Sequence, residues 1–259
     1  MRTRHIWLTA AVLALATGAV GTARAADEAR ELEHQFGIVG RDTEEGRRFN
    51  DELDRVVGRM TRATGYELKS AILLGGRTEK NDKVINAFAL PDGRIYVTLG
   101  LMRAIADAAN PDAELAFVVG HEMTHVVEKH GRRQARKGTL AMILATILGS
   151  ATRSQGAQDV LGAGAAAYVS HYSRKDEYAA DRGGLLAMRR AGYPLAASVS
   201  MLERLQRKGE DSSGFINGLF GSHPLTRNRI NRIKQLIADI QAGRISPDGD
   251  PKDSPRDRR

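Results

Sequence analysis

The sequence predicts an α+β protein in which helices predominate and a small antiparallel β element lies beside one long helix. Apolar residues recur at helical spacing through much of the chain, for example at Leu53, Val56, Val57 and Met60. A β-hairpin is indicated by two short apolar segments, "KVINAFAL" and "RIYVT", which "PDG" joins. With 259 residues and 42% hydrophobic residues, the chain is long enough for one domain with its own core.

The composition excludes several classes of protein. The sequence has no cysteine, so a disulfide scaffold, an iron–sulfur cluster, a cysteine nucleophile and a lipid anchor on cysteine are all excluded. Any metal site must therefore use His, Asp and Glu. No basic–aromatic strand and no His/Cys finger is present, so we expect no nucleic-acid partner.

Residues 1–25 have the pattern of a secretory signal peptide. Arg2 and Arg4 provide a positive start, Ile6–Val20 is apolar, and "ARA" at Ala23–Ala25 fits a cleavage site. An uncleaved anchor is the alternative, although the apolar stretch is short for a membrane span of ~20 residues. We therefore expect an exported protein in the periplasm, either free or associated with the membrane.

The next elements follow from local patterns. Asp27–Gly65 is charged and helical in pattern. Tyr66–Leu74, "YELKSAILL", is predicted as a strand that Gly75–Gly76 terminates, and the β-hairpin comes next.

A long helix is predicted after the hairpin. Asn110 is a suitable N-cap, Pro111 suits the first helical position, and Asp112 and Glu114 complement the helix dipole. Gly131 is predicted to end this helix. The stretch "VVGHEMTHVVEKHG" therefore belongs to a helix and not to a loop.

Residues 139–170 are unusually apolar. They contain "TLAMILATILGSA" and "VLGAGAAAYVS" around a polar connection, and they are predicted as a helical hairpin rich in Ala and Gly. Two core helices are one interpretation. A hydrophobic flap that makes peripheral contact with a membrane is the other.

Three further helices complete the predicted domain, at Arg174–Arg190, Pro194–Lys208 and Leu225–Ile240. The chain ends in a charged segment with several prolines and few apolar residues, so residues 243–259 are predicted to be a disordered tail. A single domain over residues 26–242 is expected.

His121, Glu122 and His125 form an HExxH motif inside the predicted long helix. Residues four apart share a helix face, so both imidazoles can bind one Zn²⁺ ion. Glu122 is rotated by about 100° and can reach a water molecule on the metal without ligating it. A chance match is the alternative, but the flanking apolar residues are typical of a buried catalytic helix.

A catalytic zinc site needs a third protein ligand and one open position. His130 does not fit this requirement, because five residues along a continuous helix place it about 140° beyond His125. It could face the same ion only if the helix broke between the two residues.

A glutamate from a second helix is the better candidate for the third ligand. In "SRKDEYAADRGGL", Glu177 is followed four residues later by Asp181, so both carboxylates share one helix face. Glu177 could ligate the ion, and Asp181 could accept a hydrogen bond from a ligand histidine. The neighbouring Asp176 would point elsewhere. For Glu177 and Asp181 taken alone, a solvated helix face is the alternative.

These motifs resemble peptidase family M48, the gluzincin metallopeptidases that include the HtpX-like and CAAX-prenyl-protease-like groups. "HEMTHVVEKH" and "EYAAD" carry the resemblance, and "NAFALPDGRIYVTLGLM" and "SHPLTRNRI" are similar to two further family motifs. The resemblance extends over residues 84–233. Multi-span membrane segments of the prenyl-protease branch are absent, which puts the processing of prenylated substrates in doubt.

The resemblance implies a zincin-like metallopeptidase domain with one zinc ion per chain, held by His121, His125 and Glu177, and with Glu122 as the catalytic base. It also implies that His223 lies near the metal. There His223 would either stabilise the reaction's oxyanion or occupy the open metal position in a latent state. A plain helix N-cap is the alternative for this residue.

Arg229 falls at the arginine of the family motif. The resemblance implies that it helps to orient the site, and an ordinary structural ion pair is the alternative. In zincins an edge strand beside the cleft pairs with an extended substrate, which makes Asn86, Ala87 and Phe88 the candidate substrate-binding residues. A core-facing strand is the alternative for this segment.

The function expected from these observations is that of a zinc metalloendopeptidase acting on misfolded or misassembled cell-envelope proteins, a protein quality control hydrolase. The alternative is a largely latent protease that acts as a chaperone-like assembly factor. In that case the apolar stretches at residues 139–170 and 214–221 would cover the cleft or bind client proteins.

Overall fold

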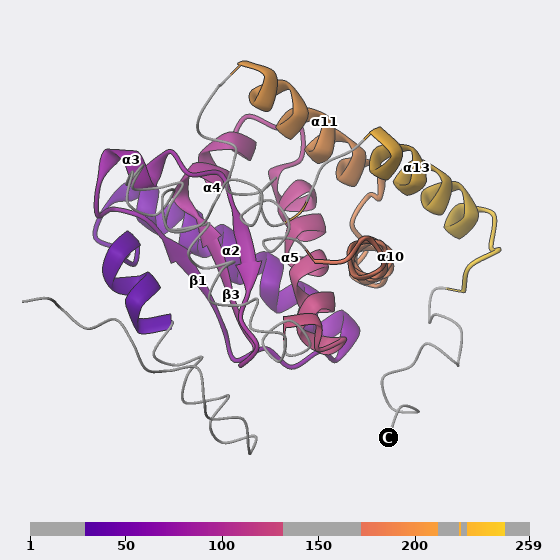
Figure 1. The fold of residues 1–259 in the computed structure, drawn as a ribbon, viewed down its shortest axis with the longest axis horizontal. Helices are drawn as coiled ribbons and strands as arrows, with labels where there is room; N and C mark the ends of the chain where they lie inside the picture. Colours follow the sequence, from indigo (N-terminus) through magenta and orange to yellow (C-terminus); the bar gives the residue numbers. More distant parts are fainter. Residues whose placement is uncertain (1–28, 132–171, 212–222, 224–226, 247–259) are drawn as a thin grey trace, which may run out of the picture.

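The computed structural model describes residues 29–131, 172–211, 223 and 227–246 (Figure 1). A helical segment covers residues 29–36. The named elements that follow are α2 (Glu44–Thr64), β1 (Ser70–Leu74), α3 (Glu79–Asp82), β2 (Ala87–Ala89), β3 (Arg94–Thr98), α4 (Leu99–Ile105), α5 (Pro111–Val127), α10 (Arg174–Arg190), α11 (Ala196–Asp211) and α13 (Arg227–Gln241). Helices predominate and one small sheet is present, so the predicted α+β class is confirmed.

Helix α2 is the first long element, and its ends follow capping rules. The Thr43 hydroxyl accepts a hydrogen bond from the Gly46 N–H, and the chain leaves the helix at Gly65 with a φ of 68°. The face that turns inward carries the predicted apolar residues. Its buried apolar side chains are Phe49, Leu53, Val56 and Met60.

The sheet has three strands in the order β1-β3-β2. β2 and β3 pair antiparallel, which is the predicted hairpin, and β1 pairs with β3 in parallel. The sheet is therefore mixed and not purely antiparallel. β1 also begins at Ser70, four residues later than the predicted start at Tyr66. Parallel strands need a long connection between them, and the residue pattern of one strand does not show which distant strand it pairs with.

Helix α5 is the centre of the fold and lies between the sheet and α10 (Figure 1). The Asn110 side chain caps it by accepting from the Ala113 N–H, and Pro111 occupies its first turn, as predicted. The predicted end at Gly131 is wrong, because α5 ends at Val127 and Lys129 adopts a positive φ of 55°. The helix therefore breaks just before His130.

Glycines let α10 approach α5 closely. A Cβ atom on Gly183 would lie 2.3 Å from the Thr124 hydroxyl oxygen, and one on Gly120 would lie 3.1 Å from the Gly184 Cα. Any larger side chain would push the two backbones apart. This contact sets the distance between the polar residues of the two helices.

The three predicted C-terminal helices are present as α10, α11 and α13, each within a few residues of its expected range. The predicted signal peptide (1–25), the apolar hairpin (139–170), the apolar stretch at 214–221 and most of the predicted tail lie outside the described residues. In the described part of the chain, no helix combines the length and the apolar character needed to cross a bilayer.

Candidate metal centre

Four side chains from three separate segments meet at the buried face of α5. His121 and His125 come from α5, Glu177 comes from the first turns of α10, and His223 precedes α13. One ligand atom from each lies within 4.8 Å of the others. The four groups can therefore surround a single ion.

The distances within the group are short. His121 Nε2 lies 3.0 Å from His125 Nε2. His223 Nδ1 lies 3.2 Å from His121 Nε2 and 2.9 Å from Glu177 Oε1. All four residues are buried, each with no more than 4% of its surface exposed.

Burial changes the protonation of these groups. It lowers the pKa of His121 and of His125, so both rings are neutral and offer a lone pair. Burial alone would raise the pKa of Glu177, but His223 and hydrogen bonds from the histidines hold that pKa well below its usual range. Glu177 is therefore an ionised carboxylate.

Asp181 and Arg229 contact His121 at Nδ1, the ring nitrogen that does not face His125 and His223. Asp181 Oδ1 is 3.0 Å from His121 Nδ1. The Arg229 guanidinium donates to both oxygens of Asp181, at 2.7 and 2.8 Å, and its Nη1 lies 3.2 Å from Glu177 Oε2. Burial opposes the charge on Asp181, but Arg229 holds the pKa of this carboxyl below its usual value. The structure thus places both predicted outer residues in contact with a donor.

Glu122 lies at the edge of the donor group without joining it. Its Oε1 is 3.3 Å from His223 Nε2, and its Oε2 has no hydrogen-bond partner among the described residues. The side chain is 2% exposed, and burial raises the pKa of Glu122. Among the described residues nothing occupies the hydrogen-bonding capacity of Oε2, so this atom can contact a molecule that enters the site.

His130 lies beside the donor group but is not part of it. Because α5 breaks at Lys129, His130 turns back toward the helix and its Nδ1 lies 2.9 Å from His125 Nδ1. The atom of His125 that it contacts faces away from His121. The sequence analysis allowed for a helix break but did not predict this contact.

The donor set fits a metal cation. Glu177 is an ionised carboxylate and the rings of His121 and His125 are neutral, so these groups present one negative charge and two lone pairs where water is excluded. The donors are imidazole nitrogens and one carboxylate, which suit a transition-metal ion.

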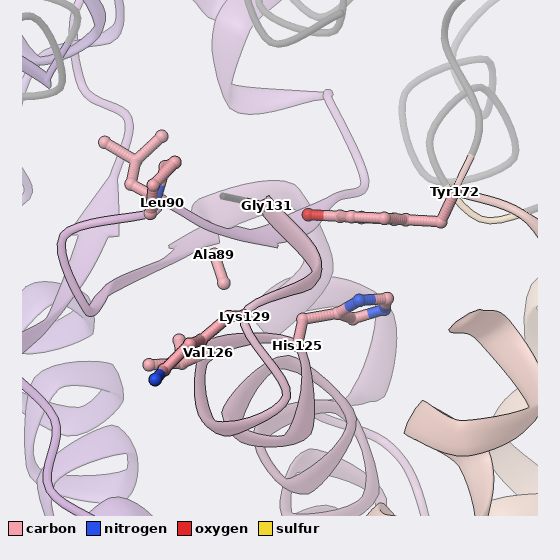
Figure 2. A pocket seen from close by; sticks show the side chains of 8 residues that line it. Ala89, Leu90, His125, Val126, Lys129, Gly131 and Tyr172 are labelled. Carbon is pink, nitrogen blue, oxygen red and sulfur yellow. The ribbon is translucent and has the colours of Figure 1, made fainter. Parts of the chain in front are cut away.

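Tyr172 is a residue of the site that the sequence analysis missed. Its ring stacks on that of His125 with 3.9 Å between centroids, and it lies 5.4 Å from the ring of His223. Tyr172, His125, Ala89 and Gly131 line a small pocket, in which the Tyr172 hydroxyl points to the Gly131 side (Figure 2). Its place five residues before Glu177 was the only signal in the sequence.

The predicted substrate strand lies at the edge of the sheet, next to α5. Asn86 accepts a hydrogen bond from the Thr98 N–H, and Leu90 donates to the Arg94 carbonyl. Because bonded and non-bonded pairs alternate along an antiparallel ladder, Phe88 also bonds to β3. Ala87 and Ala89 therefore direct their backbone groups away from β3, to the side of β2 on which no other strand pairs in the described part of the chain. Of the residues predicted for substrate pairing, Asn86 and Phe88 have their backbone groups turned toward β3.

Comparison with known proteins agrees with this site. The family model described as "Peptidase family M48" matches residues 48–237. The chain is 30% identical over 179 residues to "Mitochondrial metalloendopeptidase OMA1" of Arabidopsis thaliana, a match that covers 65% of this chain and 35% of that protein.

Two bacterial relatives are similar at a comparable level. "Beta-barrel assembly-enhancing protease" of Yersinia pestis is 28% identical over 174 residues, which is 60% of this chain and 34% of that protein. "Metalloprotease LoiP" of Escherichia coli (strain K12) is 31% identical over 164 residues, which is 60% of each chain. The chain thus spans about a third of the length of the first two relatives.

Proposed function

Since the chain belongs to peptidase family M48, we propose that it is a zinc-dependent endopeptidase that hydrolyses peptide bonds in misfolded or misassembled cell-envelope proteins. The observation that carries this proposal is the buried group of His121, His125 and Glu177 with the Glu122 carboxylate beside it, whose Oε2 has no hydrogen-bond partner among the described residues. Two histidines and one glutamate are a ligand set of catalytic zinc sites.

Each residue has a distinct role in the proposed reaction. His121, His125 and Glu177 would hold the ion, which when bound supplies Lewis acidity and stabilises negative charge near the scissile carbonyl. Glu122 accepts a proton from the attacking water and passes it to the leaving amine. Asp181 and Arg229 keep the His121 ring in place, since they contact its outer nitrogen.

The substrate class rests on three observations. In the described part of the chain, no strand pairs with the outer side of β2 at Ala87 and Ala89. That side suits pairing with extended backbone, which unfolded proteins offer more often than folded ones. Residues 1–25 have the pattern of an export signal, which supports a periplasmic location. Some relatives are named as assembly-enhancing proteases for β-barrels, which supports envelope proteins as substrates.

Glu122→Gln tests the mechanism. The amide keeps the size of the side chain but cannot accept the proton, so cleavage of unfolded casein should fall about 10²- to 10⁴-fold. Zinc content, measured by atomic absorption, should stay at about one ion per chain, because Glu122 lies outside the donor group. Cleavage at the wild-type rate would refute the proposed role of Glu122, and a wild-type protein without zinc would refute the function.

A largely latent protease that acts as an assembly factor is the second candidate, and His223 favours it. Its Nδ1 lies as close to Glu177 and His121 as a fourth ligand would. Four protein ligands close a tetrahedral zinc site, whereas a catalytic site keeps one position open. In this arrangement His223 must move before a substrate carbonyl can enter.

His223→Ala separates the two candidates. If His223 closes the site, the variant should cleave casein several-fold faster than the wild type, with unchanged zinc content. If His223 instead stabilises the oxyanion, cleavage should fall by about 10²-fold or more. Initial rates at saturating casein, with zinc supplied in slight excess, distinguish these outcomes.

A further inference from the structure

The two histidines of α5 are supported in different ways. His121 contacts a carboxylate directly, since its Nδ1 is 3.0 Å from Asp181 Oδ1. At the outer nitrogen of His125 the described residues place no carboxylate but His130, whose Nδ1 lies 2.9 Å from His125 Nδ1. His130 in turn contacts a carboxylate, because its Nε2 lies 3.4 Å from Asp176 Oδ1.

The positions of the ring protons set the direction of the hydrogen bonds that run from His125 through His130 to Asp176. If His125 Nε2 binds a metal, the neutral ring carries its proton on Nδ1 and donates it. His130 Nδ1 must then be an acceptor, so the His130 proton is on Nε2, which faces the Asp176 carboxylate. Each nitrogen has a partner of the right kind, and no group needs an additional charge.

The backbone conformation at Lys129 makes this contact possible. Lys129 is the one non-glycine residue of the described chain with a positive φ, a conformation that costs free energy for an L-residue. It reverses the chain directly before His130, which is 2% exposed. At the far end the Ser173 hydroxyl donates to Asp176 Oδ2 at 2.7 Å, which fixes the carboxylate at the start of α10.

We propose that His130 and Asp176 form a positioning relay that holds His125 in the orientation and tautomer needed to bind the metal. This inference rests on the proposed function, because it takes His125 as a ligand. Asp176 and Glu177 are adjacent on α10, so one helix end both ligates the ion directly and supports the opposite ligand through His130. Neither His130 nor Asp176 touches the reacting atoms.

Two substitutions at His130 distinguish positioning from packing. His130→Phe keeps a ring of similar size but removes the acceptor, whereas His130→Asn loses the ring but keeps an oxygen acceptor near the position of Nδ1. Positioning predicts that Zn²⁺ binds about 10- to 100-fold more weakly to His130→Phe and that His130→Asn is closer to the wild type. A packing role predicts the opposite order.

The measurement is competition for Zn²⁺ between a chromophoric chelator and the full-length metal-free protein, with circular dichroism as the check on folding. His34→Phe is the matched control, because His34 is exposed and lies outside the centre. The visible absorption spectrum of the Co²⁺-loaded protein gives a second readout, since a shifted His125 ring changes the ligand field. It should change in His130→Phe and stay unchanged in His34→Phe.

Asp176→Asn is the third variant. It tests the relay even if the protein does not fold with a substitution at buried His130. It should weaken Zn²⁺ binding several-fold alone and add little to His130→Phe, because both act through the same contact. The relay would be overturned if the losses of Zn²⁺ affinity in Asp176→Asn and His130→Phe were additive, or if His130→Phe bound Zn²⁺ with wild-type affinity. Neither result would contradict the zinc site itself. A wild-type protein that binds no Zn²⁺ would overturn the proposed function as well.

Discussion

Two Asp–Arg pairs beside helix α5 have similar geometry in opposite surroundings, one at the N-terminal end of the helix and one in its C-terminal half. Near the N-terminus, Asp112 accepts two hydrogen bonds from Arg55 at 2.6 and 2.8 Å, and these side chains are 31% and 56% exposed. In the C-terminal half, the pair of Asp181 and Arg229 has almost the same distances, but the side chains are 2% and 6% exposed.

This comparison teaches that geometry alone does not decide what a charged contact is worth. At the N-terminal end water solvates both partners, so the pair contributes little to the free energy of unfolding. In the C-terminal half water is excluded, and each charge depends on its partner.

Arg229→Met should have the largest effect on folding. It removes the buried guanidinium and leaves Asp181 and Glu177 without their cationic partner, so the free energy of unfolding should fall by about 3–5 kcal/mol. Urea denaturation at a fixed zinc concentration measures this change. Lys234→Met on the same helix is the control, because its pair with Glu203 is exposed. Equal losses in the two variants would contradict the comparison.

Arg204→Met tests a pair of intermediate burial. Arg204 Nε donates to Glu114 Oε2 at 3.0 Å, and the two side chains are 18% and 3% exposed. Burial already raises the pKa of Glu114, and loss of Arg204 should raise it further. The expected loss of unfolding free energy is about 1–3 kcal/mol at neutral pH.

The pH dependence of Arg204→Met has a definite sign. A carboxyl whose pKa is higher in the folded state contributes stability below its unfolded pKa, and this contribution is lost as pH rises through the folded pKa. The gap in unfolding free energy between wild type and variant should therefore widen from pH 5 to pH 8. In a Glu114→Gln background the gap should no longer depend on pH. A constant gap in both backgrounds would show that Glu114 does not mediate the effect.

Arg55→Ala should have the smallest effect. The pair with Asp112 is exposed, so the free energy of unfolding should fall by less than about 1 kcal/mol, and the difference should shrink in 1 M NaCl. Thermal unfolding at low and high salt measures it. A loss as large as that of Arg229→Met would mean that burial does not explain the difference between the two pairs.

The sequence could predict those parts of the site that lie on one helix. His121 and His125 share a face because of helix periodicity alone, and so do Glu177 and Asp181. The cap at Asn110 and the hairpin before α5 are equally local features. In each case the relevant residues are separated by a few positions, so backbone geometry fixes their relation.

Contacts that depend on departures from regular structure could not be predicted in this way. The left-handed Lys129 brings His130 back to His125, and no pattern marks that residue as a break. The stacking of Tyr172 on His125 joins segments far apart in the chain. The parallel pairing of β1 with β3 is a further contact of this kind.

The sequence by itself determined that His121 and His125 share one helix face, that Glu177 and Asp181 share another, and that the fold is predominantly helical, because these features follow from residue type and short-range periodicity. Tertiary structure alone decided that α10 approaches α5 closely enough, at Gly183 and Gly184, for the donors to meet within 4.8 Å. It also decided that water is excluded there. Both depend on packing between distant segments, which short-range sequence patterns do not specify.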